Sequence, residues 1–228
     1  MSGGGEKGPV ILYEDDHVLV IDKPSGMLVH RGWGDAEVAL VDVVRARTAG
    51  RAAPPVQRLD RGASGAVVFA RDAGTARSLS EAQARGEIEK RYVALVRGRP
   101  PEVATVDHPI PRKPGGPRVD AVTDVRLVAS VPCEPRAASL VEVRPRTGRL
   151  HQIRRHLKHL GHPLLGDANY GKGELNRAFE QQYGLRRLAL HALSFSLVNP
   201  VTGARVEGTA AVPVDLTEPM RAMGFFAS

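Results

Sequence analysis

The alternation of apolar and polar residues predicts a chain rich in short strands. Residues 10–26, VILYEDDHVLVIDKPSG, predict two β runs that end at a Lys-Pro-Ser-Gly turn, because Pro24 and Gly26 interrupt a strand and allow a tight reversal. The next four residues, MLVH, predict a return to extended backbone. Four further apolar runs have the same character and read AVVFAR, RYVALVRG, VTDVRLVAS and SLVEVRP.

A different spacing predicts three helices. Residues 39–47, ALVDVVRAR, place their apolar side chains on one face, and residues 73–90 are rich in Ala, Glu, Gln and Arg, which favour helix. Gly86 is expected to end the second helix. In residues 150–160 the apolar side chains recur at i, i+4 and i+7, so Ile153 lies on a narrow buried stripe.

Strands outnumber helices, which favours an α+β fold: one domain on a mixed, mainly antiparallel β-sheet with flanking helices. The run HALSFSLVNP alternates apolar and small polar residues and predicts a strand with one face toward water. HPIPRKPGGPR carries four prolines and predicts a mobile basic loop. We expect one domain over residues 10–228 and a disordered start over residues 1–9.

Composition limits the classes of protein that fit. The chain has 228 residues, 42% of them hydrophobic and 25% charged, as in a folded soluble protein. Its only cysteine, Cys133, excludes an internal disulfide, and no apolar stretch suits a secretory signal or a membrane span. We therefore expect a cytoplasmic protein. The net charge of +7 favours a polyanionic partner without identifying it.

One acidic residue stands between arginines in the segment RLDRGASG. If Asp60 is partly buried there, a nearby guanidinium is needed to keep it ionised, and Arg58, Arg61 or the distant Arg154 could supply it. The alternative is a surface loop with weak ion pairs, which contribute little to stability.

Four histidines surround the helix predicted over residues 150–160. A metal site there would need His156, His159 and a carboxylate such as Asp167, but neither a His-Glu-x-x-His motif nor a cysteine pair accompanies them. Local hydrogen bonds and phosphate contacts are the preferred interpretation.

Five ordered segments together resemble the RluA-type pseudouridine synthases, which isomerise uridine to pseudouridine in RNA. They lie between about residues 10 and 213 and read VLVIDKPSGMLVHR, RLDRGASGAVVFAR, KRYVALVRG, RTGRLHQIRRHLKHLGHPLLGDANYG and RLALHALSFSLVNPVTG. LVHRGWGD and NRAFEQQYGLRRLALHA are similar to the tRNA pseudouridine synthase C branch, which implies uridine at position 65 of tRNA as the target. Ribosomal RNA is the alternative substrate.

The resemblance assigns roles to individual residues. Asp60 corresponds to the catalytic aspartate, Tyr92 to the active-site tyrosine and Arg154 to the arginine that pairs with the aspartate. Ile153 corresponds to an apolar residue near the target base and Arg58 to an arginine implicated in base extrusion.

Two positions depart from the family pattern. Gln57 replaces a histidine before the Arg-Leu-Asp motif, and Gly62-Ala63 replaces an Asp-Thr pair after it. Both leave the acid in place, but they change the loop that carries it.

The implied reaction breaks the N-glycosidic bond, turns the uracil and joins C5 to the ribose. It needs no metal, nicotinamide or flavin, and Asp60 acts either as a nucleophile at C1′ or through a glycal intermediate. The target nucleotide has to leave its stack, which costs a few kcal/mol. Phosphate or substrate contacts are expected from basic residues that share exposed or turn positions, namely Lys23, Arg61, Arg112, Lys113, Arg118, Arg155 and Lys158.

Two other classes of function explain fewer of these residues. A non-catalytic RNA-binding or remodelling protein would fit the departures at Gln57 and Gly62-Ala63 but does not explain Asp60, Tyr92 and Arg154. A small-sugar glycosidase would need a second catalytic carboxylate beside Asp60 and leaves the basic charge unexplained. We expect a monomer with RNA as its partner.

Overall fold

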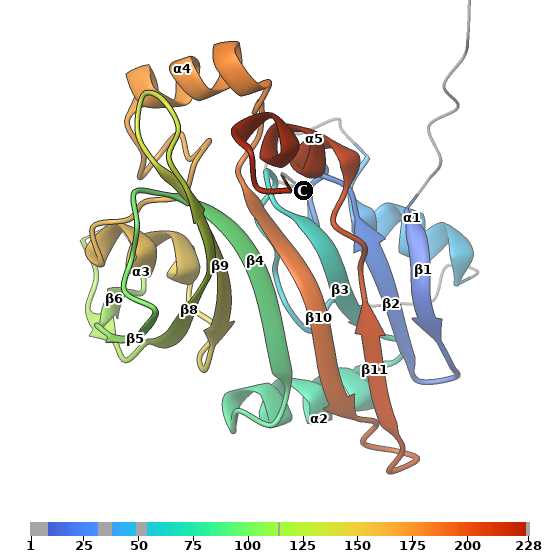
Figure 1. Ribbon diagram of the computed structural model, residues 1–228. Coiled ribbons are helices and arrows are strands. Elements are labelled where there is room, and N and C mark those ends of the chain that lie inside the picture. Colours follow the sequence, from blue (N-terminus) through green and yellow to red (C-terminus); the bar gives the residue numbers. More distant parts are fainter. Residues whose placement is uncertain (1–8, 32–37, 49–53, 114, 227–228) are drawn as a thin grey trace, which may run out of the picture.

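The computed structural model describes residues 9–31, 38–48, 54–113 and 115–226. Within these residues nine strands form one sheet in the order β1-β2-β3-β10-β4-β9-β8-β5, with β11 also paired to β10 (Figure 1). A separate two-stranded ribbon consists of β6 and β7. The strands are β1 (Val10–Glu14), β2 (Val18–Lys23), β3 (Ser64–Ala70), β4 (Glu89–Arg97), β5 (Val103–Asp107), β6 (Ile110–Pro111), β7 (Arg118–Val119), β8 (Val122–Val131), β9 (Ala138–Pro145), β10 (Leu190–Val198) and β11 (Arg205–Thr209).

The sheet is antiparallel except where β3 and β10 run parallel, which confirms the predicted mixed architecture. The parallel contact pairs Ser64 with His191 and Gly65 with Ala192. Gly65 has a φ of 110°, and a Cβ there would lie 2.3 Å from the carbonyl oxygen of Ala192. Only glycine fits this approach, so the RGASG segment is a structural requirement of the strand junction as well as part of a motif.

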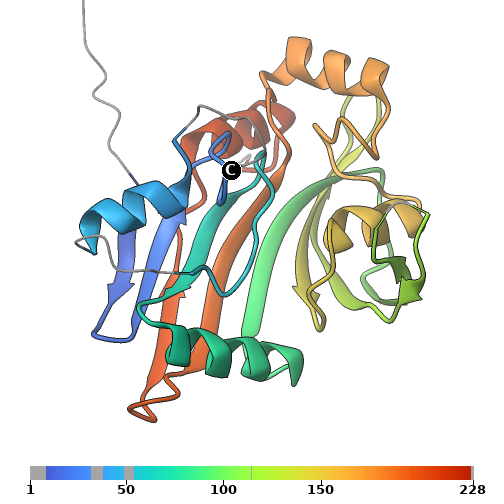
Figure 2. The same cartoon turned by 180° about the vertical axis from the view of Figure 1, so that it is seen from behind.

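Helices lie on both faces and at one end of the sheet (Figures 1 and 2). They are α1 (Leu40–Arg47), α2 (Ala73–Ala84), α3 (Gln152–His159), α4 (Gly173–Tyr183) and α5 (Val214–Met223). The three predicted helices are present, and α2 ends just before Gly86, which has a φ of 77°. No helix in the described ranges has the length and apolar character needed to cross a bilayer.

Several elements differ from the predictions. The predicted loop over residues 108–118 contains β6 and the first residue of β7, and MLVH forms no strand. Helix α4 was not predicted, and neither was α5, which contains Pro219. Helix α5 forms because Leu216, Met220 and Met223 are buried together against the end of the sheet.

The alternation along β2 divides its side chains between two cores. Leu19 and Ile21 pack in a cluster with residues of α1 and α3, whereas Val18 and Val20 pack with residues of α2. Strand β10, in contrast, is buried on both faces only at its start, where Ala192 is buried. The predicted water-facing side of β10 is therefore limited to its second half, where alternate residues are serines of intermediate exposure.

The predicted disordered start falls on residues 1–9, of which residues 1–8 lie outside the described ranges.

Candidate active site

Asp60 lies at the turn that leads into β3. The preceding residues run beside this strand, with Val56 N donating to Val68 O at 2.8 Å. The turn closes when Ala63 N donates to Asp60 O at 3.0 Å. Leu59 points into the core, while the side chain of Asp60 keeps 22% exposure. The strand junction thus holds the acid at the edge of the core.

Gln57 also anchors this turn. It is buried, and its Nε2 donates to Ala66 O at 3.2 Å. Gln57, which stands where the family pattern has histidine, is therefore a polar side chain hydrogen-bonded to β3.

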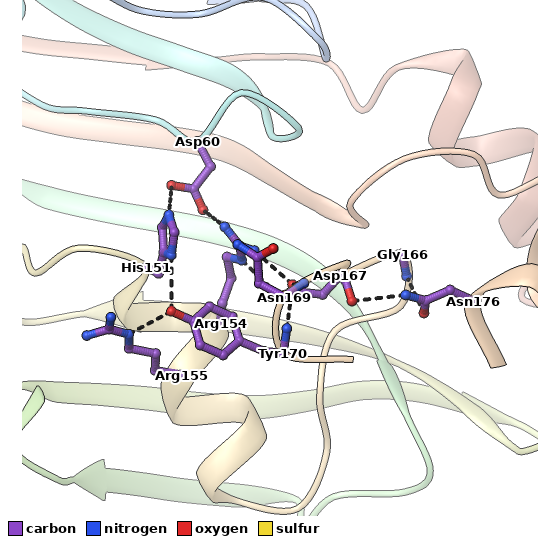
Figure 3. A network of polar contacts seen from close by, with 9 residues as sticks. All are labelled: Asp60, His151, Arg154, Arg155, Gly166, Asp167, Asn169, Tyr170 and Asn176. Atoms are coloured by element: carbon purple, nitrogen blue, oxygen red, sulfur yellow. Dashed lines mark hydrogen bonds and ion pairs between the residues drawn. The ribbon is translucent and has the colours of Figure 1, made fainter. Parts of the chain in front are cut away.

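A buried arginine joins Asp60 to a second carboxylate (Figure 3). Arg154 Nη1 donates to Asp60 Oδ2 at 3.0 Å, while Nε and Nη2 each donate to Asp167 at 2.8 Å. The side chain of Asp167 is fully buried and that of Arg154 is 9% exposed. Of the three arginines considered from the sequence, the structure brings Arg154 to the acid, as the resemblance implied.

This pairing fixes the charge of the buried groups. Burial opposes the charge of Asp167, but bonds from Arg154 and from the backbone N–H groups of Tyr170 and Asn169 lower the pKa of its carboxyl. Burial likewise opposes the charge of Arg154, yet Asp167 and Asp60 raise the pKa of its guanidinium. Asp167 therefore holds one side of the guanidinium and leaves the other for Asp60.

Helix α3 is locked in place at its first turn. Gln152 Nε2 donates to Val122 O and to Thr123 Oγ1, both at 2.9 Å, and its Oε1 accepts from Arg149 N at 3.0 Å. Ile153 is buried beneath the helix, as the apolar spacing predicts. These contacts aim Arg154 at the turn that carries Asp60, although 94 positions separate the two in sequence.

Tyr92 lies on β4 and forms part of the cavity wall. Its side chain is only 7% exposed. Burial, together with the charge of Asp60, raises the pKa of the phenol, so the hydroxyl stays protonated at neutral pH. A neutral, largely apolar ring is suited to contact a base.

These groups surround a cavity of about 1030 Å³. Among the described residues that line it, Asp60 contributes the one carboxylate, and Tyr92 and Ile153 contribute apolar surface. The remaining charged lining consists of arginines and a lysine, namely Arg58, Arg61, Lys90, Arg149, Arg154, Arg186 and Arg187. A pocket with one acid among many cations fits a phosphate-bearing substrate.

The phosphate contact predicted for Lys23 is wrong. Lys23 is fully buried, and its Nζ donates to the carbonyl oxygens of Pro24, Met27 and Arg61 at 2.9, 2.8 and 3.3 Å. Burial and the charge of Arg187 lower the pKa of its ammonium to about 7. The turn folds back over the ammonium, so Lys23 braces the loop that follows Asp60.

Arg155 also differs from its prediction. Its Nε donates to Tyr170 Oη at 2.8 Å and its Nη1 to Pro111 O at 3.0 Å, so the protein itself uses the guanidinium. Lys158 is exposed on the same helix and stays a predicted phosphate contact.

The other predicted basic residues lie on the surface. Arg112, Lys113 and Arg118 are exposed on the β6–β7 ribbon, Arg58 is exposed at the cavity, and Arg61 Nε donates to Gly26 O at 3.0 Å. Their RNA contacts stay predictions.

The clustered histidines make local contacts. His156 Nδ1 lies 2.8 Å from Thr123 Oγ1, His162 Nδ1 lies 2.9 Å from Arg97 O, and His159 stacks on His108 at 3.8 Å. In the described part of the chain, no group of three or more His, Cys, Asp or Glu residues is placed to hold a metal ion.

The sequence reasoning missed Lys90, Asp167 as a partner of Arg154, and Tyr170. Lys90 could have been found from the period of β4, since it lies two residues before Tyr92 and so on the same face. Burial lowers the pKa of its ammonium to about 8. Asp167 and Tyr170 stand in the quoted segment GDANYG, but only the fold brings them to Arg154.

Known proteins share this sequence and fold. A family model described as RNA pseudouridylate synthase matches residues 17–159. Ribosomal large subunit pseudouridine synthase D of Xanthomonas campestris pv. campestris is 38% identical over 93% of this chain and 69% of its own length. tRNA pseudouridine synthase C of Haemophilus ducreyi is 38% identical over 84% of this chain and 86% of its own length.

A solved structure, human RNA pseudouridylate synthase domain containing 1, shares the fold with a TM-score of 0.75. It has 24% identity and covers 93% of this chain and 87% of its own. Because the family model and the two bacterial relatives extend over most of the sequence, this chain belongs to the RluA-type family of RNA pseudouridylate synthases, isomerases that convert uridine to pseudouridine in RNA.

Proposed function

We propose that the enzyme acts on tRNA, with uridine at position 65 as its target, and that Asp60 carries the reaction. The observation that carries the proposal is the setting of this acid: its carboxylate is bonded to Arg154 at 3.0 Å, in a cavity whose other charged lining residues, among those described, are all cations. Such a pocket attracts the phosphates of a nucleic acid and presents a single acidic group to the sugar.

In this mechanism Asp60 acts at the ribose while Tyr92 keeps the base. As a nucleophile, the carboxylate forms a bond to C1′ as the C1′–N1 bond breaks and its electrons pass to the uracil. In the glycal route, Asp60 takes a ribose proton instead. Tyr92 stacks on the detached uracil while it turns, and Ile153 supplies an apolar contact. In the nucleophilic route C5 then bonds to C1′ as the C1′–oxygen bond to Asp60 breaks, and the proton lost from C5 is balanced by the proton gained at N1.

The substrate nucleotide has to be extruded from its helix, at a cost of a few kcal/mol. Arg58 at the cavity wall and the exposed cations of α3 and the β6–β7 ribbon can offset that cost through phosphate contacts. Lys90 supplies a further cation inside the cavity, with no carboxylate bonded to it among the described residues.

Support for tRNA comes from the similarity to tRNA pseudouridine synthase C of H. ducreyi, which includes most of both chains. The equal identity to the X. campestris ribosomal enzyme favours ribosomal RNA as the second candidate. We also propose that the enzyme is a cytoplasmic monomer that needs no cofactor.

The test is pseudouridine mapping of total tRNA and ribosomal RNA from a strain that lacks the protein. We expect one tRNA site to lose its pseudouridine and to regain it with the wild-type gene but not with Asp60→Asn. Loss at a ribosomal site alone would replace tRNA with ribosomal RNA as the substrate. The purified enzyme should sediment at the mass of one chain and stay active after dialysis against a chelator.

A further inference from the structure

Three side chains form a chain of contacts that ends at Asp60 (Figure 3). Arg155 Nε donates to Tyr170 Oη at 2.8 Å, and Tyr170 Oη lies 3.1 Å from His151 Nδ1. On the other side of the imidazole, His151 Nε2 lies 3.7 Å from Asp60 Oδ1. The two oxygens of Asp60 therefore differ, because Oδ2 is hydrogen-bonded to Arg154 and Oδ1 faces His151.

The chemistry of the donors sets the direction of this chain. The guanidinium of Arg155 can only donate, so Tyr170 Oη accepts from it. The hydroxyl proton of Tyr170 then needs an acceptor, and among the described residues His151 Nδ1 is the one within reach. The imidazole proton consequently lies on Nε2, pointing toward Oδ1. The opposite tautomer would place a lone pair against the carboxylate.

The surroundings of His151 keep it neutral at pH 7. Burial lowers the pKa of its imidazole. The negative charges of Asp60 and Asp167 raise this pKa, whereas the positive charges of Arg154 and Arg155 lower it further. These charged groups come from the turn before β3, from α3 and from the loop after it.

The backbone of His151 is also constrained. Its φ of 54° lies in the left-handed region, where it is the one non-glycine residue in the described ranges. Such a conformation is strained for a residue with a side chain and persists where packing demands it. Here it turns the imidazole toward Asp60 at the first turn of α3.

We propose that His151 is a positioning residue that makes Oδ1 the reacting oxygen of Asp60. This inference rests on the proposed role of Asp60. A separation of 3.7 Å is too long for a hydrogen bond, so the lone pairs of Oδ1 stay available to the ribose while the Nε2–H dipole orients the carboxylate. In the attack, Oδ1 donates an electron pair to C1′ and the C1′–N1 pair leaves with the uracil. The proton on Nε2 does not move.

The first test compares His151→Gln with His151→Leu in single-turnover reactions on the RNA substrate. Both variants share the backbone strain, but only glutamine retains an N–H near the position of Nε2. We expect His151→Leu to lose about 10- to 100-fold in rate with unchanged affinity, and His151→Gln to stay within a few-fold of wild type. Equal losses in the two variants, or wild-type rates in both, would overturn the proposal.

The second test removes the hydroxyl of Tyr170. In Tyr170→Phe no other described residue donates to His151 Nδ1, so the imidazole binds a proton more readily and pairs with Oδ1. The acid limb of the pH–rate profile should move to higher pH, whereas an unmoved limb contradicts the inference.

The matched control is Tyr183→Phe, whose hydroxyl donates to Glu134 O at 2.9 Å and which does not line the cavity. Wild-type turnover that is lost in Asp60→Asn establishes the proposed function independently. A failure of the His151 and Tyr170 variants in that setting overturns this inference alone. If Asp60→Asn keeps turning over, the proposed function itself fails.

Discussion

The floor and the rim of the cavity use positive charge in opposite ways. At the floor, Arg154 is nearly buried and bonded to two carboxylates. At the rim, Arg58 is exposed to water, and Lys158 is exposed on α3 outside the cavity lining. A buried ion pair holds geometry, whereas an exposed cation attracts phosphate at long range and is screened by salt. We therefore propose that the floor determines the rate of the reaction and that the exposed cations determine affinity for RNA.

The strongest way to break the floor is Asp60→Asn. The amide has nearly the same shape but cannot attack C1′ or take a proton, so we expect the rate to fall by about 10³-fold or more while RNA binding is retained. Single-turnover kinetics and a filter-binding assay measure the two effects. Asp16→Asn, which changes an exposed acid that does not line the cavity, is the control. Turnover within tenfold of wild type would show that another group performs the chemistry.

Arg154→Ala should damage both rate and stability. It leaves the buried carboxylate of Asp167 without its main partner, and loss of one member of a buried pair typically costs about 3–5 kcal/mol. Denaturant unfolding measures the loss, and activity at neutral pH should be absent. Arg154→Lys keeps the charge but not the two-pronged geometry, so its stability should be intermediate. An Arg154→Ala enzyme with full activity contradicts the pairing.

Lys90→Met tests the cation that lies between floor and rim. We expect the KM for RNA to rise about tenfold with little change in kcat, because a phosphate contact supports binding of both substrate and transition state. Lys90, with a pKa of about 8, is charged below that pH and loses its charge above it. Wild-type kcat/KM should therefore fall as pH rises through 8, and the variant should lack this part of the profile. Identical profiles would remove Lys90 from the substrate site.

The smallest effect is expected from Lys158→Ala, which removes an exposed cation of α3 outside the cavity lining. Affinity at low salt should fall a few-fold, and the slope of log K against log salt should become shallower by about 1. Arg221→Ala is the matched control, since Arg221 is exposed on α5 and does not line the cavity. Equal slopes in the two variants would exclude a phosphate contact for Lys158.

Local pattern and motif resemblance predicted the main elements of the fold and the pairing of Asp60 with Arg154. The apolar spacing of α3 correctly placed Ile153 against the core. The burial of the Lys23 ammonium could not be predicted from the sequence, because it depends on carbonyl groups that the turn and the loop after Asp60 bring together. The hydrogen bonds of Arg155 within the protein could not be predicted for the same reason, since its partners Tyr170 and Pro111 come from other parts of the chain.

The hydrogen bonds between the turn at Lys23–Gly26 and the loop after Asp60 affect how the substrate is recognised. Gly26 N donates to Arg61 O and Ser25 Oγ donates to Gly62 O, each at 2.8 Å, while the ammonium of Lys23 caps the same backbone. Because the loop is short and hydrogen-bonded along its backbone, the carboxylate of Asp60 can move little to meet the ribose. The RNA therefore has to change conformation to bring its ribose to Asp60. RNAs that distort easily at the target nucleotide should react faster than stiffer ones of the same sequence context.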